Sequence, residues 1–165
     1  MQLKKEMAIS LLSILIFSSV ASHALEGARV ELTMVAEKET VVINDQGEKE
    51  VQYVTPKIVI PGDVIVYTVN YINQSDDISE NTFITNKIPD HLTYIENSAS
   101  GTGTDILFSV DGGRQFAKPR QLIVRNADGR ERSATVKDYT HIRWVFNNAL
   151  APGGKGAVVY RARIN

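Results

Sequence analysis

The segment FSVDGGRQF, residues 108 to 116, holds the most distinctive grouping of chemically active residues in the chain. Its spacing is Ser-x-Asp-x-Gly-x-x-aromatic. The Asp111 carboxylate can accept hydrogen bonds from backbone amides of its own turn, and a carboxylate can also take part in acid–base chemistry. Gly112 and Gly113 allow the positive φ angles that a tight turn needs. The segment therefore predicts a hairpin turn that is organised by Asp111.

The same spacing resembles the Asp-box of sialidases and related β-propellers, in which the motif is a folding device. Hydrolysis of a sialoside also needs a cluster of arginines and a Tyr nucleophile with an acidic partner. A chain of this length is smaller than a propeller, so we expect Asp111 to act in folding rather than in chemistry. A carbohydrate-binding module or a remnant glycan hydrolase stays open as the alternative function.

Two other groups of residues could bind metal ions. Asp76, Asp77 and Glu80 offer the oxygen ligands that calcium prefers, although their spacing is not that of an EF-hand. Whether this acidic loop binds calcium is left open. Zinc is disfavoured because His91 is expected in a turn and His141 at an outward position of a strand. We predict no metal site and no cofactor.

Nucleophilic catalysis has little support in the sequence. The chain has no cysteine and no Gly-x-Ser-x-Gly elbow. Asp138 is close to His141 in sequence, but a catalytic triad is defined by geometry in space. Lys57 and Asn70 could form an isopeptide crosslink, a question that the sequence leaves open. We expect no catalytic residues, and we expect that the protein is not an enzyme.

The first residues have the three-part pattern of a secretory signal peptide. A basic start with Lys4 and Lys5 precedes an apolar run, and small residues then surround Ala21 and Ala24. The apolar run is shorter than the roughly 20 residues that a membrane-spanning helix needs. We predict a signal peptide over residues 1–24, cleaved after Ala24 with Ala21 as the alternative, and a single domain over residues 25–165.

Composition restricts the possible partners and compartments. The chain has 18 Lys and Arg residues against 19 Asp and Glu residues, and net charge −1. A balance near neutrality gives no electrostatic basis for binding nucleic acid. No second apolar run is long enough to span a membrane. We therefore expect an extracytoplasmic protein, in the periplasm, secreted or at the cell surface, whose fold depends on its core rather than on disulfides.

After the leader, apolar residues alternate with period two, and turn residues separate the alternating runs. Many short strands with regular turns predict an all-β antiparallel sandwich. The runs place two sets of alternate residues on predicted inner faces: Ile65, Tyr67, Val69 and Tyr71 in one set; Ile142, Trp144, Phe146, Val158, Tyr160, Ala162 and Ile164 in the other. Val30, Leu32 and Met34 share one face of the first strand. Tyr53, Tyr94 and Tyr139 are expected to be less buried.

Three segments in order resemble the conserved repeat domain of bacterial surface proteins known as domain of unknown function number eleven. They are IVIPGDVIVYTVNYINQSDD, TNKIPDHLTYIENSAS and IRWVFNNALAPGGKGAVVYRARI, which together cover roughly residues 58–164. The resemblance implies an immunoglobulin-like β-sandwich in an envelope or secreted protein. Family members usually carry tandem copies and an Asp where this chain has Asn86, so no carboxylate role is assigned to that residue.

These features favour an exported, non-enzymatic structural or protein-interaction module of the cell envelope or the medium. The expected partner is another envelope protein or a second copy of the chain. Strand edges and loops are the expected contact surfaces, because β-sandwiches often recruit partners by adding a strand.

The leader pattern gives a first testable prediction. The exported protein should begin at or near Leu25, because signal peptidase cuts after a small-residue motif such as that ending at Ala24. N-terminal sequencing of the protein from the extracytoplasmic fraction measures this directly. A soluble cytoplasmic form that retains Met1 would contradict the prediction.

Overall fold

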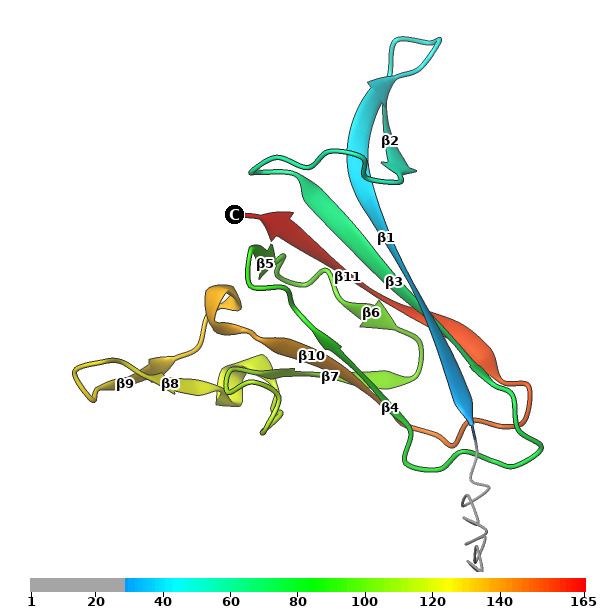
Figure 1. Ribbon diagram of the computed structural model, residues 1–165, viewed down its shortest axis with the longest axis vertical. Helices are drawn as coiled ribbons and strands as arrows, with labels where there is room; N and C mark the ends of the chain where they lie inside the picture. The colour runs from blue at the N-terminus through cyan, green and yellow to red at the C-terminus, as the bar shows by residue number, and fades with distance from the viewer. Residues whose placement is uncertain (1–28) are drawn as a thin grey trace, which may run out of the picture.

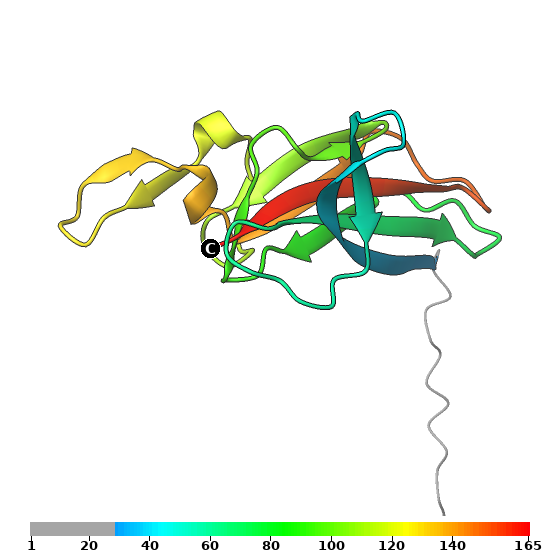
Figure 2. The ribbon, with the colours of Figure 1, turned by 90° about the horizontal axis from the view of Figure 1, so that it is seen from above.

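The computed structural model describes residues 29–165, and the predicted signal peptide over residues 1–24 lies outside this range. The fold is all-β, with antiparallel sheets packed as a sandwich-like arrangement (Figures 1 and 2). The strands are β1 (Val30–Ile43), β2 (Lys49–Val54), β3 (Val64–Asn73), β4 (Phe83–Lys87), β5 (Leu92–Tyr94), β6 (Ser100–Gly101), β7 (Thr104–Ser109), β8 (Ile123–Arg125), β9 (Glu131–Ser133), β10 (His141–Phe146) and β11 (Lys155–Ile164). Two short 3₁₀ helices, η1 (Pro119–Gln121) and η2 (Val136–Asp138), flank the β8–β9 hairpin.

The large sheet has the strand order β2-β1-β3-β11-β5, and β6 also pairs with β11. β1 is a single long strand that pairs with β3 through residues 30–39 and with β2 through residues 38–43. The β1–β2 hairpin therefore extends beyond the rest of the sheet (Figure 1). Its turn is stabilised by Asn44, whose Oδ1 accepts hydrogen bonds from the backbone amides of Gln46 and Glu48.

The small sheet has the order β4-β10-β7. The Pro89–Asp90 turn joins β4 of the small sheet to β5 of the large sheet, so the chain crosses between the layers there. Another crossing links β6 of the large sheet to β7 of the small sheet. At this crossing a Cβ on Gly101 would lie 2.8 Å from the Val158 side chain and 3.0 Å from Trp144. The segment around Gly101 is thus in close contact with the core.

The core lies where β10 faces β3 and β11. Trp144, Ile142, Val158, Tyr160 and Ala162 are fully buried, which confirms the predicted inner faces of β10 and β11. The Trp144 indole Nε1 donates a hydrogen bond of 3.0 Å to the Ser100 carbonyl, so this buried polar atom is satisfied.

Tyr67 is partly buried and stacks on Tyr160, with ring centroids 4.9 Å apart and planes within 10°. Burial raises the pKa of Tyr160, whose hydroxyl accepts a 2.8 Å hydrogen bond from the Asn86 side chain. Asn86 therefore serves as a neutral hydrogen-bond donor between the two sheets. A carboxylate at this position could not donate that bond in its ionised form.

Asn73, at the end of β3, connects two loops at one end of the sandwich. The side chain is fully buried, and its Nδ2 donates hydrogen bonds to the carbonyls of Asp77 (2.7 Å) and Leu150 (3.0 Å). Its Oδ1 accepts from the Ser75 hydroxyl at 2.7 Å. One amide thus fixes the loop that follows β3 and the loop that precedes β11.

The two sheets do not cover each other completely. On β1, the residues that share a face with the core side of β3 are those opposite Tyr71 and Val69, namely Leu32 and Met34. These two side chains are 49% and 54% exposed. β1 therefore contributes an apolar inner face that the three-stranded sheet leaves uncovered.

Core burial predicts a large stability loss on truncation of the central aromatic residue. Trp144→Ala should lower the free energy of unfolding by about 3–5 kcal/mol, the usual range for a buried large aromatic. Urea unfolding followed by circular dichroism measures the change. The matched control is Ile123→Ala on the half-exposed face of β8, which should cost less than about 0.5 kcal/mol. Equal midpoints for the two variants would contradict the assigned core.

Candidate functional site

The Asp111 loop uses its polar atoms to hold its own backbone. One oxygen, Oδ1, accepts hydrogen bonds from the Ser109 hydroxyl (2.7 Å), the Gln115 amide (3.0 Å) and the Arg114 amide (3.1 Å). The Gln115 amide, together with the Ser109 hydroxyl, lowers the pKa of Asp111 below its ordinary value. Gly112 and Gly113 have the predicted positive φ angles of 76° and 85°. The geometry is that of a self-contained turn.

Ser109 and Phe116 anchor the ends of this loop. The buried Ser109 hydroxyl also accepts a 2.9 Å hydrogen bond from the Gly113 amide. Phe116 is half-buried, and the Arg143 guanidinium lies 3.7 Å from its ring centroid and 4.3 Å from that of Phe83. Arg143 is thereby held between two aromatic rings on the outer face of the small sheet.

Asp138 and His141 do not form a catalytic pair. Both oxygens of Asp138 accept hydrogen bonds of 2.7 Å from the Arg132 guanidinium, and Oδ2 also accepts one from the Thr135 amide. Arg132 is the main reason that the pKa of Asp138 lies well below its ordinary range. His141 instead places Nδ1 3.1 Å from the Thr140 hydroxyl, and burial lowers its pKa.

The acidic loop after β3 does not gather a ligand set. Asp77 contributes its backbone carbonyl to Asn73 and to the Ser75 hydroxyl. Among the residues from 29 to 165, no three His, Asp or Glu side chains come together as a group that could hold a metal ion. Asp76 and Glu80 therefore do not belong to a cluster of acidic or histidine ligands among the described residues.

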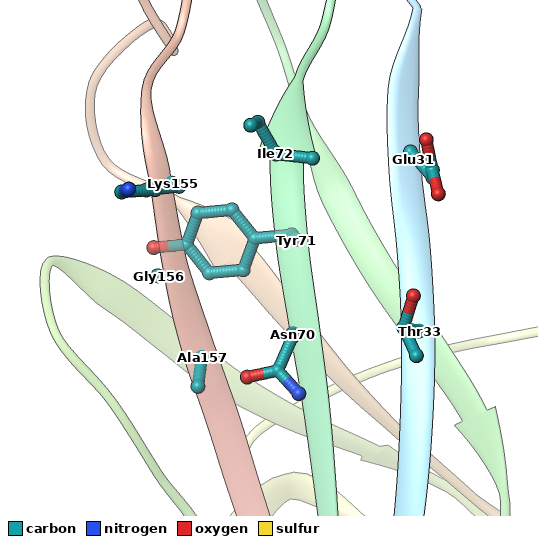
Figure 3. Close-up of a pocket in the computed structure, with 8 residues that line it drawn as sticks. All are labelled: Glu31, Thr33, Asn70, Tyr71, Ile72, Lys155, Gly156 and Ala157. Carbon is teal, nitrogen blue, oxygen red and sulfur yellow. The ribbon is translucent and has the colours of Figure 1, made fainter.

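Asn70 lies in a shallow depression on the outer face of the large sheet, between β1, β3 and β11 (Figure 3). Its volume is about 480 Å³, and its wall includes Glu31, Thr33 and Lys155. Lys57 lies in the loop that enters β3 at the other end of that strand. The fold thus separates Lys57 from Asn70 along the strand and gives no support to an isopeptide crosslink between them.

A second concave surface lies between the end of β5 and η1. It is lined by polar groups of Glu96, Lys118 and Arg120 and by the half-buried ring of Tyr139, with a volume of about 480 Å³. The Lys118 ammonium forms an ion pair with Asp105 at 2.5 Å. Arg120, the other cation that lines this surface, has no ion-pair partner among the described residues. We call this surface the Tyr139 groove.

The aromatic residues beneath the Tyr139 groove correct one sequence-based expectation. Tyr94 was expected to be less buried, but it is only 5% exposed. It packs against Phe108, with ring centroids 4.9 Å apart, and Phe108 stacks on Tyr139 at 4.5 Å. Tyr94 thus belongs to the core because β5 joins the large sheet and turns this ring inward. Tyr53 is exposed, as predicted.

Among the described residues, the side of β1 that faces away from β3 over residues 30–37 is the longest stretch of strand backbone without a partner in the large sheet. β3 occupies one side of these residues, whereas β2 begins to pair on the other side only at Lys38. The exposed side chains of Leu32 and Met34 lie along this edge. An unpaired strand with exposed apolar side chains can accept another strand. We call residues 30–37 the β1 edge.

A further apolar surface covers the β1–β2 hairpin and the loop after it. Val41 lies opposite Val51 in the register, and the neighbouring side chains on that face are also exposed. The exposed apolar residues of this region are Val41, Ile43, Val51, Tyr53, Val54, Ile58, Val59 and Ile60. Exposed apolar residues in such number are typical of interaction surfaces rather than of free monomer surface.

The sequence favoured strand edges as the expected contact surfaces but did not indicate which edge, so the β1 edge was not predicted. The signal was present as an alternating strand from 30 to 37 that carries no proline and no charged residue at its even positions. Proline residues and inward-pointing charges keep natural edge strands from pairing, and residues 30–37 have neither.

Comparisons of the chain with protein-family models, with curated proteins and with solved structures find no match. The resemblance to the bacterial surface repeat domain therefore stays a prediction. Within residues 29–165, the chain forms no helix with the length and apolar character that a membrane crossing requires.

The geometry of the Asp111 loop predicts a folding role with a defined pH dependence. Asp111→Asn should lower the melting temperature by several degrees at pH 7, because the ionised carboxylate is the stronger acceptor for the Ser109, Arg114 and Gln115 donors. The folded protein lowers the pKa of Asp111. Its stabilisation is thus fully present above the ordinary Asp pKa of about 3.9 and is lost as the pH falls through the lowered value.

Thermal unfolding of parent and variant from pH 7 to pH 2 measures this difference. The matched control is Asp45→Asn in the β1–β2 turn, whose carboxylate makes no hydrogen bond to any described residue; this variant should melt like the parent at every pH. A glycosidase activity that Asp111→Asn abolishes while the melting temperature stays constant would overturn the structural role.

Proposed function

We propose that the protein is an exported, non-enzymatic module with an immunoglobulin-like sandwich that binds another protein in the cell envelope or outside the cell. The observation that carries the proposal is the β1 edge. One side of this strand pairs with β3, its other side has no partner among the described residues, and the strand carries the exposed side chains of Leu32 and Met34. Main-chain hydrogen bonds along such an edge provide affinity, and the adjacent side chains provide specificity.

The exposed hairpin surface supports the same proposal. It extends from the sandwich next to the β1 edge, since β1 contributes to both. Val54, at the base of the hairpin, lies opposite Lys38. It is therefore on the same sheet face as Leu32 and Met34, next to the end of a partner strand on the β1 edge. The central part of a protein interface is depleted in charge, and the even-numbered residues of the β1 edge satisfy that condition.

The Tyr139 groove favours carbohydrate recognition as a second candidate function. A partly exposed aromatic ring can contact the apolar face of a sugar, and the Glu96 and Arg120 side chains at the groove wall can hydrogen-bond to hydroxyl groups. The Asp111 loop adds no residue to this candidate, because Asp111 does not line the groove and its Oδ1 is bonded within its own turn.

Site-specific photo-crosslinking in cells tests the proposed function. A benzoylphenylalanine residue replaces Met34 on the β1 edge, and in a matched control it replaces Ile123, which has similar exposure on the β8–β9 hairpin. Adducts should form at position 34 and not at position 123, and mass spectrometry of the extracytoplasmic fraction identifies them.

Absence of a protein adduct at position 34 would contradict the proposal. A glycan array run in parallel distinguishes the second candidate function. Specific glycan binding that Tyr139→Ala removes, together with no protein adduct, would favour carbohydrate recognition over protein binding.

A further inference from the structure

We infer that the β1 edge binds the β1 edge of a second copy of this chain, in an antiparallel pair that joins two large sheets into one. The inference rests on the proposed function and names the partner. A two-fold axis perpendicular to the sheet would place the inner face of each copy on the same side. The apolar even-numbered residues of the two copies would then lie next to one another.

The backbone of β1 is oriented for this pairing. The Arg29 carbonyl accepts a hydrogen bond from the Gln74 amide, and residues 29 and 74 continue the register of β1 with β3. Because backbone groups alternate along an antiparallel strand, odd-numbered residues of β1 direct their amides and carbonyls to β3. Even-numbered residues direct theirs to the open side. Leu32 and Met34 therefore present both their backbone groups and exposed apolar side chains to a partner.

Charge favours the register centred on Thr33, which brings opposite charges together. With Thr33 of both copies at the two-fold axis, Leu32 lies opposite Met34 of the second copy and Arg29 lies opposite Glu37. Neither Arg29 nor Glu37 has an ion-pair partner among the described residues, as the ion pairs involve other side chains. A shift of the centre to Met34 would instead place Glu31 opposite Glu37, and like charges directly opposite each other are unfavourable.

The length of the open edge matches this register. On each copy β2 pairs with β1 from Lys38 onward, and Pro56 follows soon after the end of β2. A partner strand can thus occupy residues 30–37 before it meets β2. Since the same limit holds for both copies, a pair centred on Thr33 uses the open segment of each chain from end to end.

Other edges of the sandwich are less suited to self-pairing. β4 carries Asn86 on its inner face, bonded to Tyr160, and has Lys87 at its end. β7 is partly covered, because Phe108 bridges to Ala117. β5 is only three residues long. The β1 edge alone combines length, open backbone groups and uncharged inner residues among the described strands, which is the opposite of the features that protect edges.

Cysteine crosslinking of the full chain, expressed with its own N-terminal segment, tests this register. The chain has no native cysteine. Thr33→Cys places two thiols directly opposite each other in a non-hydrogen-bonded pair, where Cα atoms are about 4.5 Å apart and a disulfide fits. Val35→Cys is the matched control, because its two Cα atoms would be roughly 13 Å apart along the paired strands. Mild oxidation should convert Thr33→Cys to a covalent dimer and leave Val35→Cys monomeric.

A charge exchange measured by light scattering provides the second test. Arg29→Glu and Glu37→Arg should each weaken dimerisation several-fold, and the double variant should restore it. A monomeric parent at high concentration, or equal crosslinking at positions 33 and 35, would overturn the inference. If the benzoylphenylalanine at position 34 still captures a different protein, the proposed function survives and only the second copy is rejected.

Discussion

The difference in width between the two sheets determines which strands of the large sheet are covered and which are exposed. Three strands, β4, β10 and β7, pack against a sheet that is two positions wider, so they cover β3, β11 and β5 but not β1. Beneath the covered strands, Trp144, Tyr160 and Tyr67 form a contiguous aromatic core. The same alternation of apolar residues continues along β1, where Ala36 still packs against the core but Leu32 and Met34 are exposed. The interior and the candidate interaction surface are therefore parts of one continuous sheet face.

In the loop around Asp111, residues that could do chemistry instead form hydrogen bonds that stabilise their own turn. Its carboxylate accepts hydrogen bonds from a hydroxyl and two amides of the same turn, and the Ser109 hydroxyl is buried beneath it. The neighbouring His141 ring lies against Gly113, where a Cβ would be 3.3 Å from it. The strongest chemical signal in the sequence thus marks a tightly packed corner of the small sheet. The open surfaces lie elsewhere, at positions with ordinary apolar residues.

Local patterns predicted the local structure of this protein well. The strands of the core and the turns at Gly47, Gly129 and Gly153 follow from period-two alternation and turn residues, which act over a few neighbouring positions. The burial of Tyr94 and the exposure of Met34 depend instead on which sheet each strand joins and on what packs against it. That information is in the long-range pairing, and alternation alone cannot distinguish a covered face from an uncovered one. The network around Asn73 was missed for a related reason, since it joins the adjacent loop, through Ser75 and Asp77, to the distant loop at Leu150.

The position of β11 has a consequence for the order in which the chain can fold. This strand is the last in the described sequence, yet it lies between β3 and β5 and is the only partner of β5 and β6. While the ribosome is still making the chain, β1, β2 and β3 can pair locally. The large sheet still lacks β11, so the small sheet has no complete surface to pack against. Closure of the core must wait for residues 155–164, and contacts between such distant segments form slowly. Until β11 is available, β5 and β6 have no described strand to pair with, and β3 has only β1 as a neighbour.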